Sequence, residues 1–328
     1  MKPKVYMTRM IPERGLNKIK ERFDVEIWPE EAPPPKDVII EKVRDKDALV
    51  SLLTDPIDAE VMDAAPNLKI IAQYAVGYDN IDVKAATERG IVVTNTPGVL
   101  TETVADFTMA LLLSAARRVV EADKYVRTGK WKVGWHPLMM LGQDVYGRTL
   151  GIVGLGRIGS AVAKRAKGFD MKIIYYDVIR RKDLEEKLGI EYRELDDLLR
   201  EADFVSLHVP LTEGTYHLIG ERELKLMKPT AILINTARGK VVDQEALIKA
   251  LKEGWIFAAA CDVFEQEPTP VTNPLLKLDN FIATPHIASA SIETRSRMAE
   301  IVAENLIAFF EGRKPPTIVN PEVLEGKA

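Results

Sequence analysis

The sequence predicts an α/β protein made of two doubly wound, parallel-sheet domains. Three observations support this prediction. Short apolar strand candidates alternate with helical segments along the whole chain, a glycine-rich turn joins a strand to a helix near the middle, and the alternation restarts after a long helix. At 328 residues the chain is long enough for two separate cores.

The first 95 or so residues are predicted to form one α/β unit. Its strand candidates are the apolar runs 4–8, 25–28, 48–54, 68–74 and 91–94, and its helix candidates are 15–23, 37–44 and 57–64. The segment Ala32-Pro-Pro-Pro35 must be a loop, because proline has no N–H group for a helix or a strand ladder.

The glycine-rich turn is Gly154-Leu-Gly-Arg-Ile-Gly159, between an apolar strand and a helical segment. The first glycine permits the turn, the second lets the backbone approach a pyrophosphate, and the third lets the helix pack close to the strand. The N-terminus of the helix then offers free N–H groups to the phosphates. The next strand ends at Asp177, whose carboxylate can accept hydrogen bonds from ribose hydroxyls. Together these features predict dinucleotide binding.

A long helix over 102–126 is predicted to lead out of the first unit, and a second series of strands follows it. The six candidates are 151–153, 172–176, 204–208, 231–235, 257–262 and 281–283, the number in a full dinucleotide-binding sheet. A last helix over 293–311 is long enough to return to the first unit. We therefore predict one domain from 1–99 plus 288–328, with an inserted dinucleotide-binding domain at 100–287.

Composition and charge limit the possible partners. A net charge of −4 gives no electrostatic case for nucleic acid or an acidic membrane surface, and no run of eighteen apolar residues occurs. The N-terminal residues lack the apolar stretch of a signal peptide, and Cys261 is the only cysteine, so no intrachain disulfide is possible. We expect a cytoplasmic protein with no nucleic-acid or membrane partner. Within its alanine-rich strand, Cys261 is expected to be a small core residue rather than a nucleophile.

Charged groups follow three predicted strands of the second domain, at the carboxyl edge where such sheets bind ligands. Arg238 can bind a planar carboxylate through two parallel hydrogen bonds, although a surface ion pair is the simpler alternative. Glu267 and His286 follow the last two strands. A glutamate that accepts the proton on one imidazole nitrogen leaves the other nitrogen to donate a proton near neutral pH. The simpler alternative is a solvated acidic loop with a structural histidine.

Four segments together resemble the D-isomer-specific 2-hydroxyacid dehydrogenase family in order and spacing. They are the glycine turn, Asn235-Thr-Ala-Arg-Gly-Lys-Val-Val-Asp243, Asp262-Val-Phe-Glu-Gln-Glu-Pro268 and Thr284-Pro-His-Ile-Ala-Ser-Ala290. Residues 134–138 and the turn at 74–81 are most similar to glyoxylate/hydroxypyruvate reductases. The resemblance implies a flavodoxin-like substrate-binding (catalytic) domain and a Rossmann-like nucleotide domain. It also implies NAD(P)H-dependent reduction of a small 2-oxo acid, such as glyoxylate or hydroxypyruvate, to the 2-hydroxy acid (the D-isomer where chiral).

The same resemblance implies roles for the substrate-binding and catalytic residues. His286 donates the proton to the substrate carbonyl oxygen, and Glu267 orients and tunes it. Arg238 binds the carboxylate and carbonyl of the 2-oxo acid. The backbone N–H groups of Val76 and Gly77 bind the carboxylate from the other domain.

Further contacts are implied by the resemblance alone. Leu53 contributes to the substrate pocket, and Trp135 reaches into a partner subunit's site, which implies a homodimer; no metal is implied. Ala288 departs from the usual glycine of the family. The implied cofactor contacts are Thr103, Gly154, Leu155, Gly156, Arg157, Ile158, Asp177, Val178, Ile179, Val209, Pro210, Thr215, Thr236, Ala237, Arg238, Asp262, His286 and Ala288.

Asp177 favours NAD(H) over NADP(H), because a carboxylate accepts the free 2′-hydroxyl and repels a 2′-phosphate. Like charges at such a site cost several kcal/mol. Arg180 and Arg181 lie three and four residues further on, so NADP(H) stays the alternative.

Other activities on the same scaffold are the competing interpretations. They are D-lactate or phosphoglycerate dehydrogenase activity, and a nucleotide-sensing regulator without turnover. Formate dehydrogenases carry an amide where Glu267 stands, which argues against that activity. The sequence does not separate glyoxylate from hydroxypyruvate, pyruvate or a longer 2-oxo acid.

Overall fold

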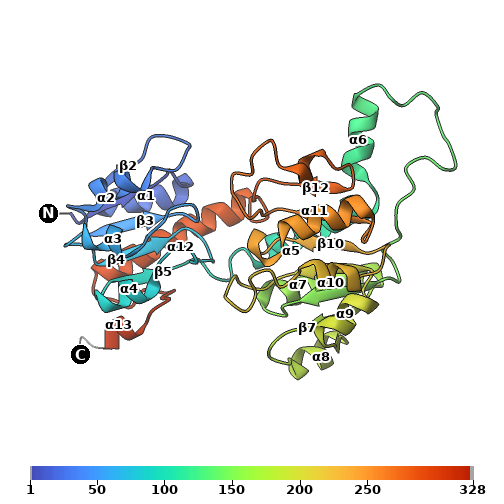
Figure 1. Ribbon diagram of the computed structural model, residues 1–328. Helices are drawn as coiled ribbons and strands as arrows, with labels where there is room; N and C mark the ends of the chain where they lie inside the picture. Colours follow the sequence, from blue (N-terminus) through green and yellow to red (C-terminus); the bar gives the residue numbers. More distant parts are fainter. Residues whose placement is uncertain (1, 326–328) are drawn as a thin grey trace. The chain divides into compact units, whose positions relative to one another are not determined.

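The computed structural model describes residues 2–325, which divide into two compact units (Figure 1). The first unit contains the described parts of 1–100 and 290–328, and the second contains 101–289. Each unit is built around a single parallel sheet. The predicted fold class, two doubly wound parallel-sheet domains, is therefore confirmed.

The sheet of the first unit has the strand order β2-β1-β3-β4-β5, which is the flavodoxin-like order. Its strands are β1 Lys4–Met7, β2 Asp24–Ile27, β3 Ala48–Ser51, β4 Ile70–Gln73 and β5 Val92–Thr94, and all neighbours pair in parallel. The helices are α1 Glu13–Arg22, α2 Lys36–Val43, α3 Ala59–Asp63, α4 Val83–Glu88, α12 Ile292–Phe310 and α13 Glu322–Glu325. The short helix α4 was not predicted, because six residues are too few to show an apolar period.

The C-terminal helix α12 belongs to the first unit, where it packs against α1. The approach is so close that a Cβ on Gly15 would lie 2.1 Å from the carbonyl oxygen of Ala299. Only glycine fits at that contact. Residues nearly 300 positions apart in the sequence therefore share one core.

The sheet of the second unit has the order β12-β11-β10-β9-β6-β7-β8, again all parallel. Read from β8 to β11, this is the classic dinucleotide-binding order, and β12 extends it by one strand. The strands are β6 Thr149–Val153, β7 Lys172–Tyr176, β8 Glu191–Tyr192, β9 Phe204–Leu207, β10 Ile232–Asn235, β11 Ala258–Cys261 and β12 Phe281–Ala283. The prediction missed β8, because two half-exposed residues carry no strand pattern.

The single helix predicted over 102–126 is wrong: two helices occupy this segment, α5 Thr101–Ala116 and α6 Val119–Arg127. Arg118 separates them in the left-handed region, at φ 53°, and its guanidinium pairs with Glu121 at 2.7 Å. Arginine is a good helix former, so no local pattern indicated the break. The other helices of this unit are α7 Arg157–Ala166, η1 Lys167–Phe169, α8 Lys182–Leu188, α9 Leu195–Glu201, α10 Glu221–Leu226, η2 Gly239–Val241, α11 Gln244–Glu253 and η3 Pro274–Lys277.

Cys261 is buried at the end of β11, as predicted for a core residue. Burial, with a smaller contribution from the charge of Asp262, raises the pKa of its thiol to about 12. The thiol is therefore protonated and unreactive near neutral pH. Within residues 2–325, none of the helices combines the length and apolar character needed to cross a bilayer.

Candidate active site

The glycine turn has the geometry that its sequence predicts. A Cβ on Gly154 would lie 2.8 Å from the backbone of His208, and one on Gly159 would lie 2.1 Å from the carbonyl oxygen of Gly154. Gly156 instead faces open space, and it precedes α7 without a side-chain cap on the helix. The first N–H groups of α7 therefore remain accessible to an anion beside a glycine that admits close approach. These residues fit the pyrophosphate of a dinucleotide.

Asp177 lies directly against this turn. One carboxylate oxygen accepts a hydrogen bond from the N–H of Leu155 at 2.7 Å, and the other accepts one from the N–H of Ile179 at 3.2 Å. Each oxygen keeps a further lone pair for a hydroxyl donor. The strand end and the glycine turn thus hold the carboxylate where the sequence predicts the ribose.

The two arginines that follow are both engaged by neighbouring acids. Arg180 binds Glu185 through two hydrogen bonds, of 2.8 and 2.9 Å, and Arg181 binds Asp183 through two, of 2.9 and 2.8 Å. Val178 and Ile179, which separate Asp177 from Arg180, are 87% and 69% exposed. Each guanidinium is thus paired with an acid further along the chain. The hydrogen bond of Asp183 raises the pKa of Arg181, and the charge of Asp177 also contributes to this rise.

Arg238 follows β10 on a turn that the preceding asparagine shapes. The side-chain oxygen of Asn235 accepts the N–H of Ala237 at 3.0 Å, and its amide nitrogen donates to the carbonyl of Arg238 at 2.9 Å. A Cβ on Gly239 would lie 1.8 Å from the backbone of Phe264. Glycine therefore lets the arginine turn lie directly against the loop that leads to Glu267.

Glu267 and His286 form a hydrogen-bonded pair, with the carboxylate 2.7 Å from Nδ1 of the imidazole. The other carboxylate oxygen accepts the N–H of Phe264 at 2.9 Å. Burial raises the pKa of Glu267, but the hydrogen bond and charge of His286, the N–H of Phe264 and the charge of Arg238 together bring it below its usual value. An ionised carboxylate can only accept, so Nδ1 carries the hydrogen and Nε2 is left to exchange a proton.

The backbone around His286 is held by Asp262. His286 has φ 55°, in the left-handed region that non-glycine residues seldom adopt. The fully buried carboxylate of Asp262 accepts the N–H groups of Ile287 and Ala288, at 2.9 and 2.7 Å, and the hydroxyl of Thr284 at 2.7 Å. These three bonds stabilise the turn that presents the imidazole. The side chain of Asp262 is thus committed to this turn.

Most of the remaining predicted cofactor contacts of the second unit lie in the loops that follow its strands. Thr236 shares a hydroxyl hydrogen bond of 3.0 Å with Thr108 of α5, and Val209 lies against Gly154. The hydroxyl of Thr215 donates to the carbonyl of Pro210 at 2.6 Å, so it closes its own loop. Thr103 lies in the first turn of α5.

In the first unit, the turn after β4 presents the two predicted peptide groups. The carbonyl of Ala75 accepts the N–H of Thr96 at 2.8 Å, and the carbonyl of Val76 accepts the side-chain amide of Asn95 at 2.8 Å. These peptides are trans and planar, so the N–H groups of Val76 and Gly77 point away from those donors. Within residues 2–325 neither N–H has a hydrogen-bond acceptor. Leu53 lies on the loop after β3, half-buried.

Sequence reasoning missed the amide side chains that shape these turns, namely Gln73, Asn80, Asn95 and Asn235. Gln73 and Asn235 each end an otherwise apolar strand, and that position was the available signal. A buried amide must find partners, so a polar residue at a buried strand end indicates a shaped turn.

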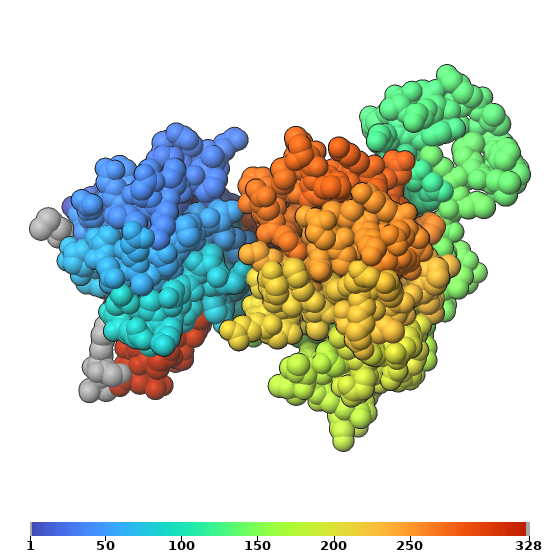
Figure 2. Space-filling view, in the orientation of Figure 1, coloured from blue at the N-terminus to red at the C-terminus, as the bar shows by residue number. Residues whose placement is uncertain are grey.

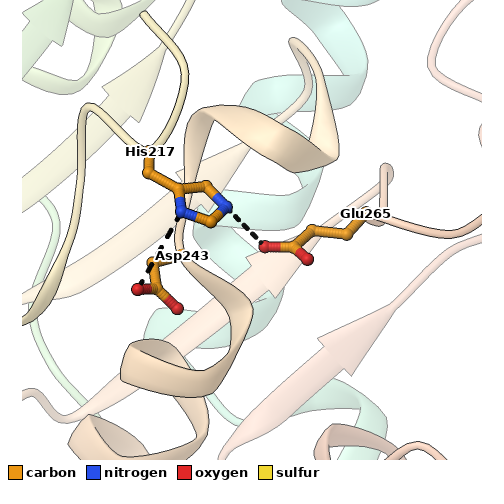
Figure 3. A group of neighbouring side chains, drawn as sticks. All are labelled: His217, Asp243 and Glu265. Carbon is orange, nitrogen blue, oxygen red and sulfur yellow. Dashed lines mark hydrogen bonds and ion pairs between the residues drawn. The ribbon is translucent and has the colours of Figure 1, made fainter.

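A second histidine lies near the Glu267 loop, between two carboxylates (Figure 3). Nε2 of His217 lies 2.9 Å from Glu265, and Nδ1 lies 4.0 Å from Asp243 at the start of α11. The oxygen of Glu265 that faces His217 also accepts the N–H of Gln244 at 3.0 Å. The two ring nitrogens face different acids, so the imidazole links the chain segments of Asp243 and Glu265. One possible ligand atom from each of the three residues lies within 4.8 Å of the other two.

Trp135 lies on an arm that extends from the second unit, made of α6 and the loop 128–146 (Figures 1 and 2). The arm exposes a series of large apolar side chains. Trp135 is 78% exposed, and the others are Val119, Val120, Val126, Trp131, Val133, Leu138, Leu141 and Tyr146. An apolar surface of this kind is typical of a protein contact.

Comparisons with known proteins agree with this geometry. The profile "D-isomer specific 2-hydroxyacid dehydrogenase, NAD binding domain" matches residues 109–288. A protein of Korarchaeum cryptofilum named glyoxylate reductase is 72% identical over 325 residues, covering 99% of this chain and 98% of that protein. One of Thermococcus gammatolerans with the same name is 61% identical over 330 residues, covering 100% and 98%.

A solved structure extends the similarity to three dimensions. It is the NADPH-dependent glyoxylate/hydroxypyruvate reductase of Sinorhizobium meliloti in complex with NADP and malonate, with a TM-score of 0.87 and 36% identity. The match covers 97% of both chains. The second unit is thus a binding domain for a nicotinamide dinucleotide, and this protein is an NAD(P)-dependent dehydrogenase. The chain belongs to the D-isomer specific 2-hydroxyacid dehydrogenase family.

Proposed function

We propose that this protein reduces glyoxylate and hydroxypyruvate to the 2-hydroxy acids, with His286 as the proton donor. The observation that carries the proposal is the hydrogen bond between Glu267 and His286, in which a carboxylate oxygen lies 2.7 Å from Nδ1. The charge of Arg238 is among the causes that lower the pKa of Glu267. The pair supplies a proton to a carbonyl oxygen, and the guanidinium binds a carboxylate. A 2-oxo acid has both groups on adjacent carbons.

The glycine turn, the start of α7 and Asp177 would hold the cofactor, whose nicotinamide supplies the hydride when it is bound. The chain's own residues handle the proton. Because Nδ1 of His286 is held by Glu267, Nε2 gives its proton to the oxygen that becomes the hydroxyl. The imidazole left behind is neutral, and its Nδ1–H bond to the carboxylate persists. Arg238 and the N–H groups of Val76 and Gly77 are the proposed ligands of the substrate carboxylate.

NAD(H) is the proposed cofactor. Asp177 places a carboxylate beside the glycine turn, and Arg180 and Arg181 are each paired with another acid, which offsets the positive charge that a 2′-phosphate would need. NADP(H) is the alternative cofactor, because the similar reductase from Sinorhizobium meliloti is NADPH-dependent. Initial rates with NADH and NADPH at equal concentration test the preference, and a clear preference for NADPH would overturn it.

A homodimer that uses the arm is also proposed. The apolar side chains of α6 and of the loop 128–146 would be covered by a second copy, and Trp135 is the most exposed of the tryptophan and tyrosine side chains among them. Light scattering of the wild type and of Trp135→Ala measures the molecular mass. A wild-type monomer at micromolar concentration would contradict the proposal. A cytoplasmic location, expected from the sequence, stays a prediction.

The substrate is tested with a panel of 2-oxo acids that differ in length and charge. We expect the highest kcat/KM with glyoxylate or hydroxypyruvate and lower values with pyruvate and longer 2-oxo acids. In the oxidative direction we expect no activity with formate. A higher kcat/KM for pyruvate would favour the D-lactate type of dehydrogenase. Absence of turnover with every 2-oxo acid, together with tight dinucleotide binding, would favour a sensing role.

A further inference from the structure

We infer that three neutral side chains of the first unit, Gln73, Asn80 and Asn95, are positioning residues that hold the turn after β4 so that the N–H group of Gly77 faces the substrate carboxylate. The neighbouring N–H group of Val76 is oriented by the backbone, since the carbonyl of its peptide, that of Ala75, accepts the N–H of Thr96 at 2.8 Å. We call these three side chains the amide clamp. The inference rests on the proposed function, because that function assigns the carboxylate to this turn. None of the three needs to touch the substrate.

Asn95 fixes the peptide group between Val76 and Gly77, which carries the N–H of Gly77. Its side-chain nitrogen donates to the carbonyl of Val76 at 2.8 Å, from a buried position at the end of β5. The backbone of Asn95 is itself held by Thr317, whose carbonyl accepts its N–H at 3.2 Å and whose hydroxyl donates to its carbonyl at 2.7 Å. In a trans peptide, C=O and N–H point in opposite directions, so drawing the carbonyl of Val76 to Asn95 turns the N–H of Gly77 the other way.

Gln73 fixes the following peptide group, between Gly77 and Tyr78, and so holds Gly77 from its other side. Both ends of the Gln73 amide have hydrogen-bond partners. Its side-chain nitrogen donates to the carbonyl of Gly77 at 3.2 Å and to the side-chain oxygen of Asn80 at 2.7 Å. Its side-chain oxygen accepts the hydroxyl of Ser51 at 2.7 Å. Both hydrogens of the amide are used, and its oxygen is paired, so the side chain of Gln73 has one orientation and the Gly77 carbonyl follows it.

Asn80 joins this turn to the loop that carries Leu53. Its side-chain nitrogen donates to the carbonyls of Leu52 and Asp55, at 3.0 and 2.8 Å. The loop after β3 and the turn after β4 are therefore linked through two side-chain amides. A shift in one loop must change the hydrogen bonds of the other.

The absence of charge in the clamp matters for an anionic ligand. A carboxylate in place of any clamp amide would lose the N–H donors and place a negative charge near the substrate anion. The buried Asp55 of the same region is paired with Arg9 at 3.0 Å, so its charge is balanced. Neutral donors orient the peptide groups without opposing the anion.

The test is the isosteric substitution Asn95→Asp, compared with Asn320→Asp as a matched control. Asn320 is another buried asparagine of the same unit, which binds the backbone of Ile91 and Val93 instead of the turn. We expect Asn95→Asp to raise KM for glyoxylate roughly 10- to 100-fold, the effect of weakening one hydrogen bond to a charged group. The KM for the dinucleotide should change less than about twofold, because the second unit binds it.

Asn95→Ser is the second variant. Its shorter side chain loses the hydrogen bond to the carbonyl of Val76 without adding a buried charge. Binding of oxamate, a non-reacting analogue of a 2-oxo acid, gives a readout that does not depend on turnover. We expect its Kd to rise in parallel with KM in both Asn95 variants and to stay near the wild-type value in Asn320→Asp. Thermal midpoints of all variants report any general loss of stability.

The outcomes separate the two proposals. If the wild type turns over glyoxylate but the Asn95 variants change KM and oxamate Kd no more than Asn320→Asp does, the amide clamp is overturned and the proposed function stands. If the wild type neither turns over nor binds any 2-oxo acid, the proposed function and the clamp that rests on it both fail. A selective rise in KM and Kd supports the clamp.

Discussion

The two units prepare their functional turns by different means. In the second unit, carboxylates hold the turn of His286: Asp262 binds its backbone and Glu267 binds its ring. In the first unit, neutral amides hold the turn of Val76 and Gly77. A proton donor needs a charged partner that fixes its tautomer, whereas peptide groups that bind an anion are best oriented by uncharged donors. The difference follows from what each turn handles.

The largest effect should come from removing the proton donor. His286→Ala leaves no group to supply the proton, so kcat for glyoxylate reduction should fall by roughly 10² to 10⁴. Dinucleotide affinity, measured by fluorescence titration, should change little, because the glycine turn is intact. Near-full activity would show that the His286 turn of the second unit does not supply the proton. The assigned difference between the turns of the two units would then be wrong.

A second charge, that of Asp177, should control cofactor choice. Asp177→Ser removes the repulsion of a 2′-phosphate, so the ratio of kcat/KM with NADPH to that with NADH should rise roughly a hundredfold. Arg180→Ala in the wild-type background is the control, and it should leave the NADH value nearly unchanged because Arg180 pairs with Glu185. An unchanged ratio in Asp177→Ser would mean that this charge does not face the ribose.

Asp262 provides the direct contrast with the amide clamp. Asp262→Asn replaces one accepting oxygen by an NH₂ group, which faces N–H and O–H donors and cannot accept from them. The His286 turn should therefore lose its fixed geometry. We expect kcat to fall roughly tenfold or more, with KM for glyoxylate changed much less. Asn95→Asp should show the opposite split. The same pattern in both variants would remove the distinction between a charged turn for proton transfer and a neutral turn for binding.

The smallest effect should be on stability, through Glu267. Its pKa in the folded protein lies below the ordinary 4.5, so its ionised form stabilises the fold above that pH, and this contribution disappears as the pH falls through the lowered pKa. Glu267→Gln should therefore lower the melting temperature at pH 7 by roughly 2 to 4 °C. The difference from the wild type should shrink below about pH 4.5. An equal difference at pH 7 and pH 4 would contradict the assigned charge.

Much of the fold could be predicted because α/β periodicity is local. The five strands of the first unit and six of the seven in the second were identified from short apolar runs. Failures came where no local pattern exists. The break at Arg118 depends on a single residue in the left-handed region, and β8 is too short to show a period.

For the candidate site, the sequence could predict which chemical groups take part but not which partners orient them. Arg238, Glu267 and His286 each follow a strand of a parallel sheet, so the sequence could place them at one edge. It could not show that Asp262 binds the turn of His286, because those partners are more than twenty residues apart in the chain and meet only through the sheet. The amide clamp escaped notice for the same reason.

Glycine spacing, apolar period and residue chemistry are local properties, and they were enough to predict the fold class, the dinucleotide turn and the reacting groups. The hydrogen bonds that orient those groups became visible only in the folded chain. The imidazole tautomer depends on Glu267 across 19 positions, and the direction of the Gly77 N–H depends on Asn95, which directly follows the next strand, β5. Orientation depends on partners that only folding brings into contact.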